Sequence, residues 1–276
     1  MNYRHAYHAG NPADCLKHAV LALLVRAFRD KDKPFYVLDT HAGIGLYDLA
    51  GEEAGRTGEW VDGIARLLKA PDPPAALAPY LEQVRALNPE GGLRWYPGSP
   101  LIARRHLRGG DRLVLCELHA EDRAALAARF AGDRQVKVHQ LDGYLALKSF
   151  LPPVERRGLV LVDPPFERRD EFAALARGAG EAFRRFATGC YALWYPIKEP
   201  GEVARFHAGL PRLPAEKSLV AEVMFGRARS LPGTGLAILN PPYRLGEALA
   251  TLLPFIAAQL GDADASWRLA SLGEAA

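Results

Sequence analysis

The residues best suited to chemistry are Asp163-Pro164-Pro165-Phe166, which directly follow the apolar run 158–162. The run predicts a buried strand, and the two prolines end it at a rigid corner because they lack an N–H and fix φ. A flat ring with an exocyclic amine can donate to the Asp163 carboxylate and the Pro164 carbonyl while stacking on Phe166. The corner therefore predicts binding of a base through its amine, although an Asp-Pro strand end is also compatible with a simple turn.

A second corner of the same type, Asn240-Pro241-Pro242-Tyr243, follows the run 235–239. Acidic residues at the ends of earlier strands lead along the chain to Asp163, and no glycine-bearing strand–helix loop follows Asn240. We therefore place the amine site at Asp163 rather than at Asn240.

A glycine-bearing loop, 39–45, follows the expected strand 35–38 and contains His41 and Gly43. This arrangement is typical of the first strand–helix turn of a nucleotide-binding fold, where glycines let a ligand approach the backbone. The loop matches neither GxGxxG nor the GK[ST] of a P-loop, so the pattern does not favour ATP hydrolysis.

Acidic residues also end the next two expected strands: Glu117 ends 111–117, and Asp142, followed by Gly143, comes after 136–140. Ligands of open α/β sheets bind at the carboxyl ends of strands, where such an acid commonly accepts ribose hydroxyls. The alternative for Glu117 is that it caps the following helix.

Several elements must position these residues. Apolar spacing predicts a helix from Pro12 to about Arg29 and another over 170–185. Residues 46–98 interrupt the alternation of strands and helices, and we interpret them as a helical insertion within a single domain of 276 residues. The runs 219–225 and 235–239 predict an antiparallel pair that closes the sheet, and the tail from residue 244 looks helical and then polar.

Composition is that of an ordinary globular protein, with 49% hydrophobic and 24% charged residues and a net charge of +3. Arginine pairs such as Arg168-Arg169 and Arg184-Arg185 could hold phosphates on one face or simply be solvated. The three cysteines are widely spaced without a CxxC motif, which argues against a disulfide framework or a zinc site and suits a reducing cytoplasm. No signal-peptide pattern or membrane-length apolar run is expected.

Polar side chains dominate the first nineteen residues, among them Tyr3, Arg4, His5 and Lys17. These residues precede the first strand, so they predict either an arm that folds over the Asp163 corner to contact RNA or a surface arm that packs on the fold. The nearby histidines do not form an assured helical pair, and we expect no metal site.

Together these motifs resemble class I S-adenosylmethionine-dependent methyltransferases of the adenine-N6 type, and more narrowly the ribosomal RNA large subunit methyltransferase J family. Phe166 stands where the family corner usually has Tyr, so the stacking face is kept and a hydroxyl is lost. The matching stretches span nearly the whole chain: YRHAYHAGNPADCLKH, DKPFYVLDTHAGIGLYDL, RTGEW, YPGSPLIAR, CELH, DGY, LPPVERRGLVLVDPPFE and RFATGCYALWYP.

The resemblance implies an α/β, Rossmann-like fold with a mostly parallel seven-stranded sheet and an inserted helical subdomain that helps to hold substrate. It implies methylation of an adenine N6 amine in 23S rRNA that is free of ribosomal proteins. The enzyme would be a cytoplasmic monomer with Asp163, Pro164 and Phe166 at the catalytic corner. Tyr3 would contact RNA together with Phe166. The implied S-adenosylmethionine site consists of His18, His41, Ser99, Glu117, Asp142, Gly143 and Asp163.

Other functions remain open from the residues alone. One is a methyltransferase for a different amine, such as DNA adenine or a protein glutamine side chain. Another is a non-catalytic RNA-binding module, which the intact Asp163 and acidic strand ends disfavour.

Overall fold

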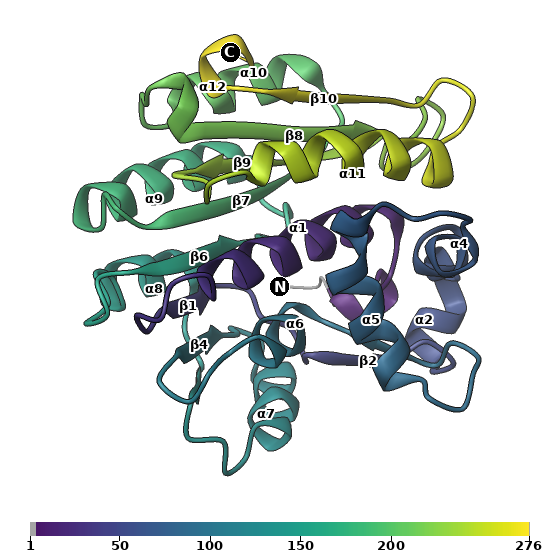
Figure 1. The fold of residues 1–276 in the computed structure, drawn as a ribbon, viewed down its shortest axis with the longest axis horizontal. Coiled ribbons are helices and arrows are strands. Elements are labelled where there is room, and N and C mark those ends of the chain that lie inside the picture. The colour runs from purple at the N-terminus through teal and green to yellow at the C-terminus, as the bar shows by residue number, and fades with distance from the viewer. Residues whose placement is uncertain (1–3, 276) are drawn as a thin grey trace.

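An eight-stranded sheet forms the centre of the computed structural model, which describes residues 4–275 (Figure 1). Five neighbouring strands, β7, β6, β1, β4 and β5, are parallel, whereas β9 runs antiparallel to β7 and β8, and β10 runs antiparallel to β8. The strand order is β10-β8-β9-β7-β6-β1-β4-β5. The bounds are β1 Tyr36–Asp39, β4 Arg112–Cys116, β5 Val136–His139, β6 Gly158–Val162, β7 Cys190–Ile197, β8 Ser218–Met224, β9 Gly233–Leu239 and β10 Ser266–Ala270.

The α/β class and the mostly parallel sheet are confirmed, but the sheet has eight strands, one more than expected. The additional strand, β10, lies in the tail that we expected to be helical and then polar. It is an edge strand that pairs only with β8, and its first residues, including Trp267, are exposed. Because an edge strand needs little apolar sequence to pair, periodicity does not reveal it.

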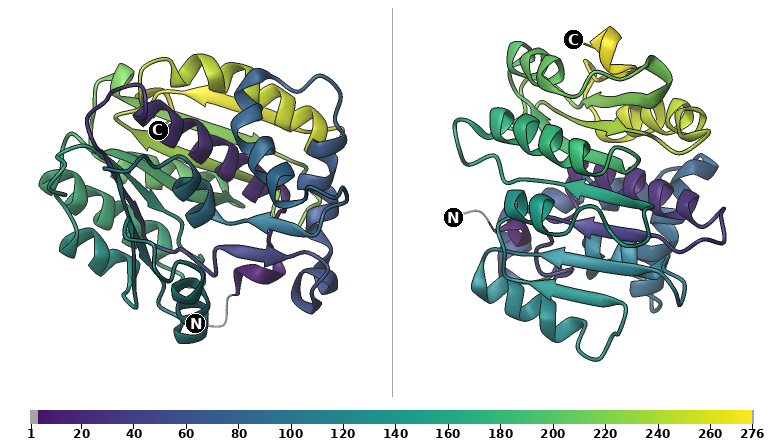
Figure 2. Two further views of the ribbon diagram at one scale, coloured as in Figure 1. Left: turned by 60° about the horizontal axis from the view of Figure 1, so that its bottom comes forward. Right: turned by 90° about the vertical axis from the view of Figure 1, so that its left-hand side faces the viewer.

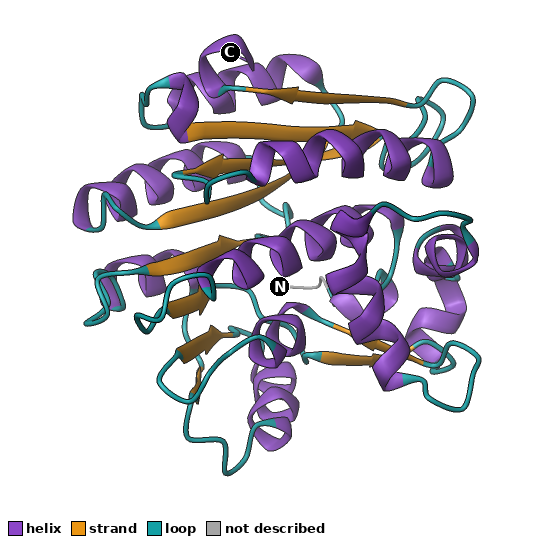
Figure 3. Ribbon diagram, in the orientation of Figure 1, coloured by secondary structure: helices purple, strands orange, loops and turns teal. Residues whose placement is uncertain are grey.

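Helices cover both faces of the sheet (Figures 2 and 3). Along β6, Leu159 and Leu161 pack into one apolar cluster, whereas Val160 and Val162 pack into the other, so the strand is buried on both sides. The first cluster holds α1 (Pro12–Phe28), α5 (Ala78–Leu87), α6 (Ser99–Arg105), α7 (Ala120–Arg129) and α11 (Leu245–Leu260), and the second holds α8 (Gly143–Ser149), α9 (Glu171–Arg185), α10 (Pro200–Gly209) and α12 (Leu272–Ala275).

The segment 46–98 begins and ends in a small antiparallel sheet, in which Leu46 pairs with Pro97. The helical pattern over 59–68 is divided at Gly63 in the structure. The segment packs on α1 and α11 (Figure 1). Its elements are β2 (Leu46–Asp48), α2 (Glu52–Thr57), α3 (Glu59–Asp62), α4 (Ile64–Lys69), η2 (Ala75–Leu77), α5 and β3 (Trp95–Pro97). No helix over residues 4–275 has the length and hydropathy to cross a membrane.

Candidate functional site

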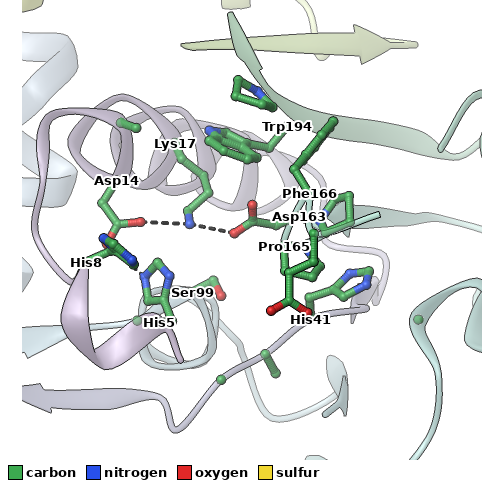
Figure 4. Close-up of a pocket in the computed structure, with 18 of the residues that line it drawn as sticks. His5, His8, Asp14, Lys17, His41, Ser99, Asp163, Pro165, Phe166 and Trp194 are labelled. Carbon is green, nitrogen blue, oxygen red and sulfur yellow. Dashed lines mark hydrogen bonds and ion pairs between the residues drawn. The ribbon is translucent and has the colours of Figure 1, made fainter. Parts of the chain in front are cut away.

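A cavity of about 620 Å³ lies at the carboxyl ends of the parallel strands (Figure 4). It brings together nearly every residue that the sequence singled out, from segments far apart in the chain. Tyr3 lies outside the described residues. The predicted residues that line the cavity are His18, His41, Ser99, Glu117, Asp142, Gly143, Asp163, Pro164 and Phe166.

The Asp163 carboxylate is held by a buried lysine. Lys17 on α1 places its Nζ 2.5 Å from Asp163 Oδ2 and 2.8 Å from Asp14 Oδ1, and its side chain is only 5% exposed. Burial alone would lower the pKa of Lys17, but the two carboxylates outweigh it and raise that pKa above its usual value. Lys17 therefore stays charged, fixes one oxygen of Asp163 and leaves the other to accept a hydrogen bond.

This position of Lys17 differs from the sequence-based expectation, which grouped it with an arm that either folds over the Asp163 corner to contact RNA or packs on the surface of the fold. Helix α1 carries it into the interior, so it is not available to a nucleic acid backbone. The sequence does contain a signal: Asp14 and Lys17 are an i, i+3 charge pair in a mostly apolar helix.

Phe166 adopts a left-handed backbone conformation, with φ of +51°. This conformation is uncommon for a bulky residue and tends to occur at functional sites, where surrounding contacts hold it. The Phe166 ring meets Phe172 and Trp194 edge to face, at centroid distances of 4.8 and 5.7 Å. The ring therefore lines the cavity in a fixed orientation, and Trp194 is a second lining aromatic that the sequence did not single out.

Glu117 is positioned by the glycine loop. Its Oε2 accepts the Gly43 N–H at 2.9 Å, and its Oε1 accepts the His119 N–H at 2.8 Å. Helix α7 is capped by the His119 side chain instead, so the alternative role of Glu117 as the helix cap is wrong. Burial raises the pKa of Glu117, and the two backbone donors moderate the rise.

Asp142 does cap a helix, because its Oδ1 accepts the N–H groups of Tyr144 and Leu145, both at 3.0 Å. Its neighbour Gly143 lies against the glycine loop, where a Cβ would sit 2.5 Å from His41 Cε1. Burial lowers the pKa of His41 to about 4, so that imidazole is neutral at physiological pH. The loop after β5 thus fits tightly against the loop after β1.

Asp39, at the end of β1, is a buried carboxylate with an unpaired oxygen. Its Oδ1 accepts the His41 N–H at 3.2 Å, whereas Oδ2 has no hydrogen-bond partner among residues 4–275. Burial raises the pKa of Asp39 to about 6. On the other side of the site, burial lowers the pKa of His18 to about 3, and its Nδ1 lies 2.7 Å from Tyr96 Oη.

The N-terminal segment 4–10 reaches across the cavity. Arg4 pairs with Glu121 on α7 at 2.8 Å, His5 contacts Asp14 at 2.9 Å, and His8 contacts Glu59 at 3.0 Å. His5 and His8 also line the cavity (Figure 4). The segment therefore joins α7, α1 and the 46–98 segment around the site.

The second corner lies elsewhere. Strand β9 is antiparallel to β7, so Asn240 follows it at the opposite edge of the sheet, near the start of β7. Its Nδ2 donates to the carbonyls of Ala187 and Gly189, both at 2.8 Å, and Tyr243 is 92% exposed. None of its residues lines the cavity.

Comparisons with known proteins show which proteins this chain resembles over nearly its whole length. The family model described as "Ribosomal RNA large subunit methyltransferase D, RlmJ" matches residues 32–272. Ribosomal RNA large subunit methyltransferase J of Escherichia coli K12 is 43% identical over 275 residues, which cover 97% of this chain and 98% of that protein. The protein of the same name from Haemophilus influenzae is 40% identical over 260 residues, 93% of this chain and 92% of the relative.

A solved structure shares the fold over nearly the whole length. Protein LPL1258 of Legionella pneumophila is 32% identical and superposes with a TM-score of 0.89, covering 96% of this chain and 98% of that chain.

Proposed function

The chain belongs to the RlmJ family of ribosomal RNA large subunit methyltransferases, and from that premise we propose that it methylates the exocyclic N6 amine of an adenine in 23S rRNA. The observation that supports this most directly is the ion pair between Lys17 and Asp163 at a prolyl corner that ends a central strand. The methyl donor is S-adenosylmethionine. We further propose that the protein acts in the cytoplasm as a monomer, on RNA free of ribosomal proteins.

The residues of the cavity fit S-adenosylmethionine by their donor and acceptor chemistry. The cofactor carries ribose hydroxyls, an adenine amine and an α-amino group, all of which donate hydrogen bonds. Glu117 suits the ribose hydroxyls, and the Asp142 carboxylate suits an amine donor such as the adenine amine. The neutral His18 and His41 add no positive charge that would oppose a sulfonium.

The corner would orient the substrate amine. Asp163 Oδ1 and the Pro164 carbonyl accept the two N6 hydrogens, and the adenine ring stacks on Phe166. When bound, the cofactor supplies an electrophilic methyl group on a sulfonium. The amine lone pair is normally delocalised into the ring, and these two hydrogen bonds favour a more pyramidal nitrogen and stabilise the positive charge that develops on it. The nitrogen loses this charge when one of its two protons leaves after methyl transfer.

Lys17 would keep the Asp163 carboxylate in the orientation that accepts the substrate amine. Its ammonium holds Asp163 Oδ2 at 2.5 Å, so that the carboxylate cannot rotate away from the amine. Reaching the corner requires a paired adenine to flip out of its helix, at a cost of a few kcal/mol that stacking on Phe166 partly offsets.

The proposal is tested by offering labelled cofactor with protein-free 23S rRNA, assembled large subunits and DNA of matching sequence. We expect methylation of the naked rRNA, with N6-methyladenosine as the product in nucleoside mass spectrometry. Efficient methylation of the DNA with none of the rRNA would replace this substrate by DNA adenine. Cofactor binding without methylation of any of the three would instead support a non-catalytic module.

A further inference from the structure

A groove of about 670 Å³ opens between α9 and α10 beside the catalytic corner. Helix α9 starts just after the corner, and its Phe172 lines the groove while contacting Phe166 at 4.8 Å. Phe172 in turn contacts Phe206 of α10 at 5.6 Å. The groove therefore begins directly behind the residue that is proposed to stack on the target base.

Four arginines line this groove: Arg169, Arg177, Arg184 and Arg205. Arg177 and Arg184 are seven residues apart, so they lie on one face of α9. Helix α9 has 15 residues and is about 22 Å long at 1.5 Å per residue, which is enough to follow several nucleotides. The arginines on α9 thus form a track that leads away from the corner.

The carboxylates in the groove cancel only part of this charge. Asp170 pairs with Arg168 at 2.9 Å and also lies 3.9 Å from Arg177. Glu181 pairs with Lys148 at 3.0 Å, and Glu202 is the third carboxylate that lines the groove, against four arginines. Arg169, Arg184 and Arg205 form no ion pair with any residue between 4 and 275. Because guanidinium groups bind phosphates bidentately, this groove suits a polyanion.

Small side chains also line the groove. Ala173, Ala176, Gly180 and Gly209 line it, and a Cβ on Gly209 would lie 3.3 Å from Ala176 Cβ. The two helices therefore approach closely at Ala176 and Gly209.

The 46–98 segment, for which the family resemblance implies a part in holding substrate, has a net charge that does not favour contact with phosphates. It carries five Lys and Arg side chains against eight Asp and Glu, a net charge of −3. Phosphates dominate the affinity of proteins for nucleic acids, so a net negative segment is a poor main contact.

We propose that the α9–α10 groove binds the sugar–phosphate backbone of the rRNA next to the target adenine, with Arg169, Arg177, Arg184 and Arg205 as phosphate contacts. This inference rests on the proposed function, because it assumes that the substrate is RNA. It adds a surface that positions the substrate outside the cavity and assigns the 46–98 segment no main part in RNA affinity.

The test compares two double variants that each remove two positive charges. Arg184→Gln with Arg205→Gln changes the groove, whereas Lys69→Gln with Arg85→Gln changes exposed positions of the 46–98 segment. Binding of a 23S rRNA transcript is measured over a range of salt concentrations, and cofactor affinity is measured by calorimetry. Methyl transfer is recorded separately.

We expect the groove variant to bind the transcript about tenfold more weakly, with the slope of log K against log salt reduced by about 1.4–1.8 for two lost phosphate contacts. Cofactor affinity should not change, and the control variant should bind RNA like the wild type. Unchanged RNA binding by the groove variant, or an equal loss in the control, would overturn the inference. Groove-dependent binding without methylation would support the groove and refute the proposed activity.

Discussion

At the scale of single residues, the site depends on one buried cation between two carboxylates. Lys17 holds Asp14 and Asp163 together, and all three side chains lie in or beside the cavity. His5 and Lys17 keep the pKa of Asp14 well below its usual value despite burial, so Asp14 remains charged. The arrangement orients Asp163 by a network and not by a single contact.

We expect Lys17→Met to reduce methyl transfer at least tenfold, because Asp163 loses the contact that fixes its Oδ2. The free energy of unfolding should fall by about 3–5 kcal/mol, since two buried carboxylates lose their cation. Turnover and denaturant unfolding measure the two effects. Lys69→Met, at an exposed position, is the control, and Lys17→Arg, which keeps the charge, should retain more stability than Lys17→Met. Wild-type turnover in Lys17→Met would refute a positioning role.

Glu117 gives a prediction about pH. A carboxylate that accepts ribose hydroxyls must be ionised, and burial raises the pKa of Glu117. Cofactor affinity should therefore be full above this raised pKa and fall as the pH drops through it. In Glu117→Gln, affinity should be weaker by about 1.5–3 kcal/mol at neutral pH and should lose this pH-dependent component. Calorimetry across pH measures both, and an unchanged affinity would remove Glu117 from the cofactor site.

At the scale of elements, the 46–98 segment clamps the start of helix α1. The Ile64 N–H donates to the Gly10 carbonyl at 2.9 Å, next to Asn11, which caps α1. Gly63 lies so close that a Cβ there would sit 2.0 Å from Gly10 O. Since α1 carries Lys17 into the site, this contact connects the segment to the catalytic corner.

Gly63→Ala should therefore lower both stability and turnover. Overpacking of this kind typically costs about 1–3 kcal/mol, and the shift of α1 should reach Lys17. Gly55→Ala in α2 is the matched control, because a Cβ at Gly55 meets nothing within 4 Å and alanine favours a helix. Thermal unfolding and turnover of both variants give the comparison. Equal stability and turnover in Gly63→Ala and Gly55→Ala would show that the contact between Gly63 and Gly10 does not matter for folding or for the active site.

At the scale of the whole molecule, strand direction separates the two prolyl corners. Strand β6 runs parallel to its neighbours, so Asp163 lies at the carboxyl ends of the parallel strands, together with the acidic residues that follow the other strands. Strand β9 runs in the opposite direction, so Asn240 lies at the other ends of these strands. Two similar sequence motifs thus acquire different surroundings.

Asp163→Ala should lose nearly all methyl transfer while binding S-adenosylmethionine within about tenfold of the wild type, because Asp163 faces the amine more than the cofactor. Asn240→Ala should keep methyl transfer, with at most a modest loss of stability from its two hydrogen bonds to backbone carbonyls. Transfer of a radiolabelled methyl group by the two variants decides which prolyl corner is the active one. Loss of activity in Asn240→Ala together with retained activity in Asp163→Ala would place the active site at Asn240 instead.

The sequence by itself determined the parts of this protein that depend on local pattern. Apolar runs located the central strands and helix α1, and the polar residues that follow the strands identified side chains that now line one cavity. This was possible because the carboxyl ends of parallel strands meet at one edge of a sheet, so that order along the chain predicts proximity.

Only the tertiary structure decided what depends on packing between distant segments. Lys17 and Asp163 are 146 residues apart, and their contact exists because α1 packs across the sheet beside β6. The eighth strand exists because the exposed edge of β8 accepts a partner with little apolar sequence. Periodicity shows which face of a helix or strand is buried but not which other element covers that face. The contact between Lys17 and Asp163 and the pairing of β10 with β8 both depend on which element lies beside which.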